Sequence, residues 1–263
     1  HSQNDILSSG GSVQTISVSQ ALPFSEGIIE NFYMEYFMKG IKSESLKDDS
    51  VIVSGHSYQS KEPGITITMN GVFEKQISKN QGQENELIYL SKPLGTGYLL
   101  AAYFNNSDFL SSIDFQNLIG WLKMGNSMAS EISKSFKSNI TTDISGFGLA
   151  SHLSDICKSS KLSAEIKLNK EILINKNIGI LQNFKSTGFD NNYSSSINDI
   201  LISDSNKLKN ILFDPQTNGP LLLSIHKKDQ IEFEKKFQLK LGFSPILIGK
   251  FKKSGDKLIN VID

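Results

Sequence analysis

The segment between Thr141 and Leu153 constrains the fold of this chain more than any other. Two threonines and Asp143 stand directly before the Gly-x-Gly turn at Gly146–Gly148, and an apolar run with helical spacing follows. Glycines let a backbone turn tightly and approach a ligand, and the first turn of a helix directs its free N–H groups outward. Asp143 at such a turn can hold a hard cation that bridges phosphate oxygens. A plain turn followed by a helix cap is the competing interpretation.

Composition narrows the class of protein. The 263 residues are enough for one large domain or two ordinary ones. The 27 basic and 27 acidic residues cancel, which removes the electrostatic basis for binding nucleic acid or an anionic membrane. No apolar run has the length of a bilayer span, no signal peptide opens the chain, and the single Cys157 excludes an internal disulfide framework. We therefore expect a globular, cytoplasmic protein.

Hydrophobic periodicity predicts strands and one long helix in the first part of the chain. Alternation indicates strands over Val13–Leu22 and Ile65–Val72, the second with one face buried, and helical spacing indicates a helix over Ser25–Lys39. A short buried strand at Val51–Val53 is expected to run into a glycine turn. The polar run Ser78–Glu86 has the composition of a domain linker.

The second part of the chain also alternates between strand and helix patterns, so the class is α+β. We expect two domains, residues 1–80 and 87–263. The predicted strands are Leu87–Leu90, Ala164–Leu168, Leu221–Ile225, Pro245–Phe251 and Leu258–Ile262. The predicted helices are Tyr98–Phe104, Ser112 to about Lys134, Asn177–Asn183 and Lys228–Phe237, and the polar stretch Ser186–Ser205 is predicted to be a loop.

Four glycine-bearing turns lie where a strand is predicted to give way to a loop or helix. None is a P-loop or a dinucleotide-binding fingerprint. They are Ser54–Ser57, Lys92–Gly97, Thr142–Gly148 and Asp214–Pro220.

Three of these segments together resemble one enzyme family. Lys92–Gly97 is similar to the family motif KPLGTG, Thr142–His152 to TDVTGFGLLGH, and Asp214–Leu222 to DPQTSGGLL, in that order and at similar separations. This trio resembles the selenophosphate synthetases (selenide, water dikinases) of the aminoimidazole ribonucleotide synthetase superfamily, and the resemblance runs over essentially the whole chain. It implies a two-domain fold with an N-terminal dimerising sheet and a C-terminal sheet covered by helices, and a nucleotide site in the cleft between the two domains.

The resemblance also implies chemistry and site residues. Selenophosphate synthetases use ATP, selenide and water to make selenophosphate, AMP and phosphate, with aspartates holding Mg²⁺ ions against the ATP phosphates. Asn4–Leu7 resembles the family segment NDIYAMG and Gly55–Ser57 the segment GGHS, so Asp5 and Asp143 would be metal ligands. Asp5, together with Gly55, His56 and Ser57, would line the nucleotide. A turn or helix cap is the alternative interpretation of Asp5.

Departures from the family pattern bear on activity. The family's glycine-rich segment with its catalytic Cys (or selenocysteine), Lys and a further Asp has no counterpart here, and the chain opens at His1 without Met, so we expect a longer parent chain in which that segment precedes His1. No catalytic residue is therefore assigned, and the fragment is expected to be inactive alone. Ser54 and Pro220 each replace a family glycine, and Pro220 lacks an N–H donor.

Two other functions stay open beside the synthetase: a different ATP-dependent enzyme of the same superfamily, and a degenerate non-catalytic module for dimerisation or nucleotide binding. Edge strands in the first domain independently favour a homodimer. Simpler roles are expected for three other residues. His152 has the spacing of a helix-packing residue and Trp121 lies in a core stripe, whereas Lys92 either reaches a phosphate or is solvated.

Overall fold

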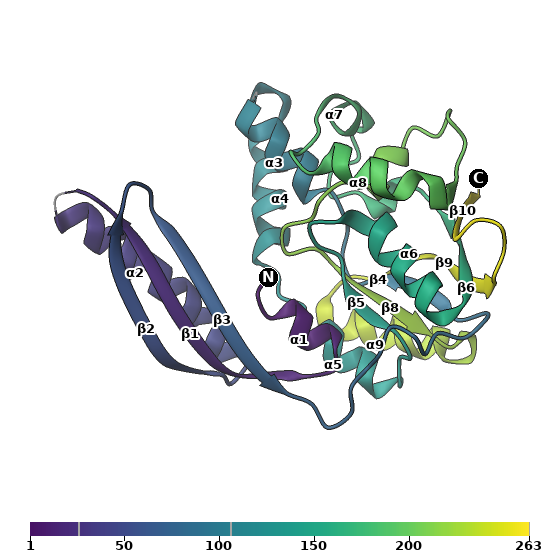
Figure 1. The fold of residues 1–263 in the computed structure, drawn as a ribbon, viewed down its shortest axis with the longest axis horizontal. Helices are drawn as coiled ribbons and strands as arrows, with labels where there is room; N and C mark the ends of the chain where they lie inside the picture. The colour runs from purple at the N-terminus through teal and green to yellow at the C-terminus, as the bar shows by residue number, and fades with distance from the viewer. Residues whose placement is uncertain (26, 106, 263) are drawn as a thin grey trace. The chain divides into compact units, whose positions relative to one another are not determined.

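A computed structural model describes residues 1–25, 27–105 and 107–262 of the chain. The chain divides into two compact units, Ser2–Gln76 and a larger one formed by Ile77–Asp263 with His1 (Figure 1). Each unit is an α+β structure with its own sheet. Among the described helices, none is long and apolar enough to cross a membrane.

The smaller unit is a three-stranded sheet of order β2-β1-β3 with one long helix. Its strands are β1 (Ser12–Pro23), β2 (Val51–Ser60) and β3 (Gly64–Val72). β1 pairs with β2 in parallel and with β3 antiparallel. A parallel pair needs a crossover connection, which α2 (Gly27–Lys47) supplies. β2 and β3 flank β1 on opposite sides, and residues 61–63 join them across the end of β1. A short helix, α1 (Asn4–Ser8), precedes the sheet.

The core of the smaller unit is small. It is centred on Val13, Ile16 and Val18 of β1 and Ile41 of α2. The expected strand over Ile65–Val72 is present as β3, but its apolar face is only partly covered and Ile65 is 39% exposed. The unit therefore leaves many large apolar side chains in contact with solvent. They are Phe24, Ile28, Ile29, Phe32, Met34, Tyr36, Leu46, Val51, Val53, Tyr58, Ile65, Val72 and Phe73.

The larger unit is built on a seven-stranded sheet of order β5-β8-β4-β9-β6-β10-β7. Pairing is antiparallel from β5 to β6 along that order, and β10 pairs in parallel with β6 and β7. Its strands are β4 (Leu87–Leu90), β5 (Thr141–Asp143), β6 (Leu162–Lys167), β7 (Ile200–Leu201), β8 (Leu221–Ile225), β9 (Ile246–Lys253) and β10 (Ile259–Ile262).

Helices cover both faces of this sheet. In β4, Ile88 and Leu90 belong to one apolar core and Leu87 and Tyr89 to another, as the two-residue period of a strand requires. The first core packs against α3 (Thr96–Asn105), α4 (Ser112–Lys123), α6 (Gly148–Ser160), α7 (Ile178–Asn183) and α8 (Phe189–Ser196). The second packs against α5 (Ser127–Ser135) and α9 (Gln230–Leu241). Strands buried on both sides explain why these segments read as continuous apolar runs.

The structure corrects three sequence predictions. The helix expected from Ser112 to about Lys134 is two helices, α4 and α5, because the helical conformation is interrupted around Gly125. The predicted loop Ser186–Ser205 contains α8 and β7, which polar composition concealed. The short buried strand at Val51–Val53 and the turn at Gly55–Ser57 are instead one strand, β2, which continues to Ser60 and leaves Val51 and Val53 exposed.

Candidate functional site

Three of the four predicted glycine motifs meet at one end of the larger sheet. β8 lies between β5 and β4 and runs antiparallel to both. Asp143 at the end of β5 is therefore opposite Leu221, and Leu90 at the end of β4 is opposite Leu222, both at the start of β8. The segments that follow β5 and β4 and the one that precedes β8 must then share this end of the sheet.

Gln216 binds the Asp214–Pro220 segment to the Lys92–Gly97 segment. Its side-chain oxygen accepts hydrogen bonds from the backbone N–H of Gly95 (2.9 Å) and of Thr96 (3.2 Å) and from the Thr96 hydroxyl (3.2 Å). The Thr96 oxygen accepts in turn from the Thr217 N–H at 2.8 Å, and the Gln216 amide nitrogen donates to the Asp214 carboxyl at 2.8 Å. One side chain thus satisfies the start of α3, where helical N–H groups have no internal partner.

The same segment is also bound to the one that contains Asp143. The Ile144 N–H donates to the Pro220 carbonyl at 2.8 Å, and the Gln216 N–H donates to the Ser145 carbonyl at 3.0 Å. Pro220 thus serves as an acceptor at a position where the family glycine would add a donor. His152 contacts Ser145, with its Nε2 3.3 Å from the hydroxyl, which agrees with a packing role for that histidine.

Glycines are required where these segments approach one another. A Cβ on Gly219 would lie 2.1 Å from the Ile144 carbonyl oxygen, and one on Gly97 would lie 2.2 Å from that of Pro215. Gly148 has a φ of +73°, which L-residues with side chains rarely adopt. By contrast, a Cβ on Gly146 would meet nothing within 4 Å. Gly219 and Gly97 therefore permit the close approach of neighbouring backbone segments, whereas the space beside Gly146 is open.

Asp143 is a buried carboxylate at this junction. It is the last residue of β5, is 6% exposed, and stands five residues before α6, whose first turn has no side-chain cap. No group of three His, Cys, Asp or Glu side chains within the described residues could hold a metal alone. Mg²⁺ commonly binds through one or two carboxylates together with phosphate oxygens and water. The donor set thus fits a magnesium ion that arrives with a phosphate ligand.

The remaining predicted site residues lie in the smaller unit. Asp5 is an exposed residue of α1. Gly55, His56 and Ser57 are exposed along β2, where they pair with Val18, Ser19 and Gln20 of β1. These three residues also line a cavity of about 200 Å³, together with Val18, Gln20, Met34 and Met38.

The Gln20 side chain contributes a buried polar group to the lining of that cavity. It is 4% exposed, and its amide oxygen has no hydrogen-bond partner. A buried acceptor without a donor costs free energy, so a donor group in the cavity would be stabilised there. The structure therefore places Gly55–Ser57 beside a small cavity rather than at a strand end.

Lys92 is buried, so the expectation of a solvated lysine is wrong. It is 2% exposed, and its ammonium donates to the Met124 carbonyl at 2.7 Å. Burial lowers its pKa to about 7, because the charged form loses hydration. The Asn218 amide donates to the same carbonyl at 3.1 Å and to that of Leu122 at 2.8 Å, so both side chains anchor the break between α4 and α5.

The sequence analysis missed two residues that hold the junction together. Gln216 stood inside a recognised motif, but its reach to Gly95 and Thr96 depends on contacts far apart in the chain. Asn192 lies in the stretch predicted to be a loop, and its amide donates to the carbonyls of Gly146 (2.9 Å) and Phe213 (3.0 Å). A buried amide in a polar, serine-rich segment carries no periodic signal.

Gly219→Ala should destabilise the larger unit strongly, because the added Cβ would overlap the Ile144 carbonyl and separate two motif segments. We expect a loss of at least about 2 kcal/mol in the free energy of unfolding, measured by urea denaturation. Gly146→Ala is the matched control from the same junction and should cost less than about 1 kcal/mol. Equal losses in the two variants would contradict the close-approach argument.

Asp214 should give the larger unit a distinctive pH dependence. Burial raises the pKa of its carboxyl to about 8, although hydrogen bonds from Gln216 and from the backbone of Gly97 and Tyr98 oppose the rise. The folded state therefore holds a proton that the unfolded chain has released above its ordinary pKa near 4, so stability should fall as pH rises from about 4 to 8.

Asp214→Asn isolates this effect, since it keeps the shape and removes the proton. Urea unfolding of both proteins across that pH range should show the wild type losing stability relative to the variant as pH rises. A constant difference would mean that the Asp214 pKa is not raised.

Comparison with known proteins supports the resemblance. No family model matches the chain. Over 220 residues it is 27% identical to the selenide, water dikinase of Treponema denticola, covering 81% of this chain and 62% of that protein. Over 212 residues it is 30% identical to that of Campylobacter jejuni, covering 78% of this chain and 60% of that protein. The chain thus spans less than two thirds of the length of these relatives.

Solved structures show the same fold at low sequence identity. Thiamine-monophosphate kinase from Stenotrophomonas maltophilia superposes with a TM-score of 0.72 at 14% identity, covering 98% of this chain and 74% of that one. The hydrogenase maturation protein HypE in complex with ATP gives 0.70 at 13% identity, covering 99% and 73%. The predicted fold is therefore confirmed: this chain is a homologue of the selenide, water dikinases and has the aminoimidazole ribonucleotide synthetase-like fold of these kinase and HypE structures.

Proposed function

We propose that this chain is the greater part of a selenophosphate synthetase-like enzyme that transfers phosphoryl groups from ATP with the help of Mg²⁺. The reaction would convert ATP, selenide and water into selenophosphate, AMP and phosphate. The observation that carries the proposal is Asp143, held at the end of β5 and followed by the uncapped start of α6. Dikinase relatives and the ATP complex of HypE support the use of ATP.

The proposed roles of Asp143 and of the start of α6 follow from the negative charge of the ATP phosphates. Phosphoryl transfer depends mainly on positioning the phosphates and neutralising their charge. Asp143 would hold a Mg²⁺ ion against the phosphate oxygens, and the first N–H groups of α6 would add the positive end of the helix dipole. Bound magnesium would supply charge neutralisation and polarise the transferred group. The hydrogen bonds from Gln216 and Ile144 would keep Asp143 in register during this step.

Residues of the smaller unit receive their roles from the motif resemblance. Asp5 would be a second metal ligand and a nucleotide contact, while Gly55, His56 and Ser57 would bind the phosphates. Exposure of all four along α1 and β2 supports access of a ligand to them. The two aminoimidazole ribonucleotide synthetase-like domains would be residues 1–80 and 87–263.

The 263 residues alone are expected to lack turnover. Cys157 is their only cysteine and is fully buried in α6, where burial raises the pKa of its thiol to about 12. A thiol that stays protonated and inaccessible cannot serve as a nucleophile. This observation, together with Ser54 and Pro220, also favours a second candidate function: a domain that keeps the fold and binds a nucleotide or a partner without catalysis.

Calorimetric titration of ATP with and without Mg²⁺ distinguishes the two candidates. Under the enzyme proposal, binding should require Mg²⁺, and Asp143→Asn should weaken it by at least about tenfold, since the carboxylate that holds the cation is lost. Asp155→Asn, on an exposed position of α6, is the matched control and should bind like wild type. Magnesium-independent binding, or full binding by Asp143→Asn, would contradict the assigned role. No binding at millimolar ATP would mean either that a segment outside these 263 residues is essential or that the domain is degenerate.

We also propose that the chain forms a homodimer through its smaller unit. Both outer strands of the β2-β1-β3 sheet have a free edge, and β2 exposes Val51 and Val53 by 60% and 57%. Unpaired edges with exposed apolar residues attract a further strand or sheet.

Light scattering should therefore give twice the 29.1 kDa of one chain. The double variant Val51→Lys/Val53→Lys should shift the protein to a monomer, because charges on an edge strand oppose pairing. Ile231→Lys, at an 82% exposed position of α9, should leave the mass unchanged. A monomeric wild type would overturn the dimer proposal.

A further inference from the structure

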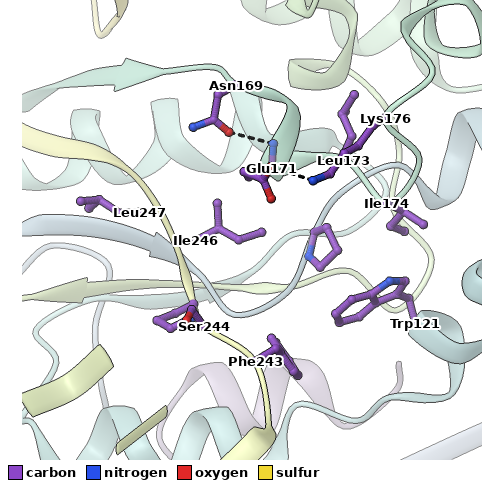
Figure 2. Close-up of a pocket in the computed structure, with 12 residues that line it drawn as sticks. Trp121, Asn169, Glu171, Leu173, Ile174, Lys176, Phe243, Ser244, Ile246 and Leu247 are labelled. Carbon is purple, nitrogen blue, oxygen red and sulfur yellow. Dashed lines mark hydrogen bonds and ion pairs between the residues drawn. The ribbon is translucent and has the colours of Figure 1, made fainter. Parts of the chain in front are cut away.

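The larger unit contains a cavity of about 560 Å³ that the proposed function does not use. It lies beside the segment Pro93–Leu94, between β9, the loop that precedes β9, and the segment around η2 (Lys170–Ile172) (Figure 2). Cavities of this size in proteins commonly hold small molecules. Its walls are apolar: Pro93, Trp121, Leu173, Ile174, Phe243, Pro245, Ile246 and Leu247.

Two aromatic side chains form one wall. The rings of Trp121 and Phe243 meet edge to face, with centroids 5.2 Å apart and an interplanar angle of 87°. Trp121 is not the core residue that its helical spacing predicted, because it is only partly buried and faces this cavity. Flat aromatic surfaces favour an aromatic ligand, which gains both buried area and ring contacts.

The polar groups of the cavity carry both signs of charge. Glu171 and Lys176 line it and form an ion pair of 2.7 Å, with side chains that are 69% and 58% exposed (Figure 2). An ion pair this exposed contributes little free energy, so a ligand can exchange with it at small cost. The Asn169 side chain accepts a hydrogen bond from the Glu171 N–H at 2.9 Å, which fixes the backbone at this rim.

From these features we infer a binding site for a small aromatic zwitterion, such as an aromatic amino acid. Its ring would lie against Trp121 and Phe243, its ammonium would face Glu171, and its carboxylate would face Lys176. A singly charged aromatic ligand would meet one favourable and one unfavourable charge at the rim, so charge complementarity selects the zwitterion.

The site is connected to the motif junction through the backbone. Leu94 pairs with Leu173, with hydrogen bonds from the Leu94 N–H to the Ile172 carbonyl (2.8 Å) and from the Ile174 N–H to the Leu94 carbonyl (2.9 Å). The next residue after Leu94 is Gly95, which Gln216 binds. A ligand in this cavity would therefore contact Pro93, which belongs to a segment that shapes the junction.

Trp121 provides a site-specific signal, because it is the only tryptophan of the chain. L-Phenylalanine should change Trp121 fluorescence with a dissociation constant below about 1 mM, in the absence of ATP and Mg²⁺. Hydrocinnamate, which lacks the ammonium, and phenethylamine, which lacks the carboxylate, should each bind at least about threefold more weakly. Since no nucleotide is present, this result is independent of whether the proposed function is correct.

Variants at the rim test the charge assignment. Glu171→Gln and Lys176→Gln should each weaken phenylalanine binding by about three- to fivefold, whereas Lys170→Gln, an exposed η2 position outside the cavity, should have no effect. Ser244→Phe, at an exposed position that lines the cavity, should fill it and abolish binding. Absence of a fluorescence change and of calorimetric heat, or equal binding of the three compounds, would overturn the inference.

Discussion

The hydrogen bonds that Gln216 makes hold the candidate site together. Its side-chain oxygen is shared by the N–H groups of Gly95 and Thr96 and by the Thr96 hydroxyl, so one acceptor organises the start of α3. Gln216 also ties its own segment to Ser145 through its backbone N–H. Three segments separated by about 50 to 120 residues in sequence are therefore fixed by a buried hydrogen-bond network, and such networks confer rigidity and a unique arrangement.

The two units differ in how they meet the cost of folding. In the larger unit, both faces of the sheet are covered by helices, and two apolar cores carry the stability. The smaller unit buries only a few residues around Val13 and Ile16, and it leaves many large side chains exposed. A domain of this size gains little stability from its own apolar core. Its exposed apolar side chains are therefore most simply explained as a surface that another protein surface covers.

Periodicity predicted most elements because burial in this fold follows a regular pattern. β1, β3, β4, β8 and α9 appear close to their expected residues. The failed predictions have local causes. Apolar spacing continues across Gly125, so it predicted one helix where the structure has α4 and α5. The packing of α8 depends on Phe189 and Asn192 rather than on an apolar stripe, so periodicity did not reveal this helix. Three of the four glycine-bearing segments that the sequence singled out lie together at one end of the larger sheet. The contacts among those loops could not be predicted, because each depends on a residue distant in sequence.

Two ionisable groups near the junction show how burial changes the state of a motif side chain. Lys92 and Asp214 both stand in motif segments, where the charged form is the ordinary expectation. Burial instead lowers the pKa of Lys92 to about 7 and raises that of Asp214 to about 8, so both groups favour the neutral form compared with the same groups in water. Their hydrogen bonds go to Met124 and Gln216, which are structural partners. The junction thus uses its buried ionisable side chains to fix the loops, and the cation contact that we propose falls on Asp143 instead.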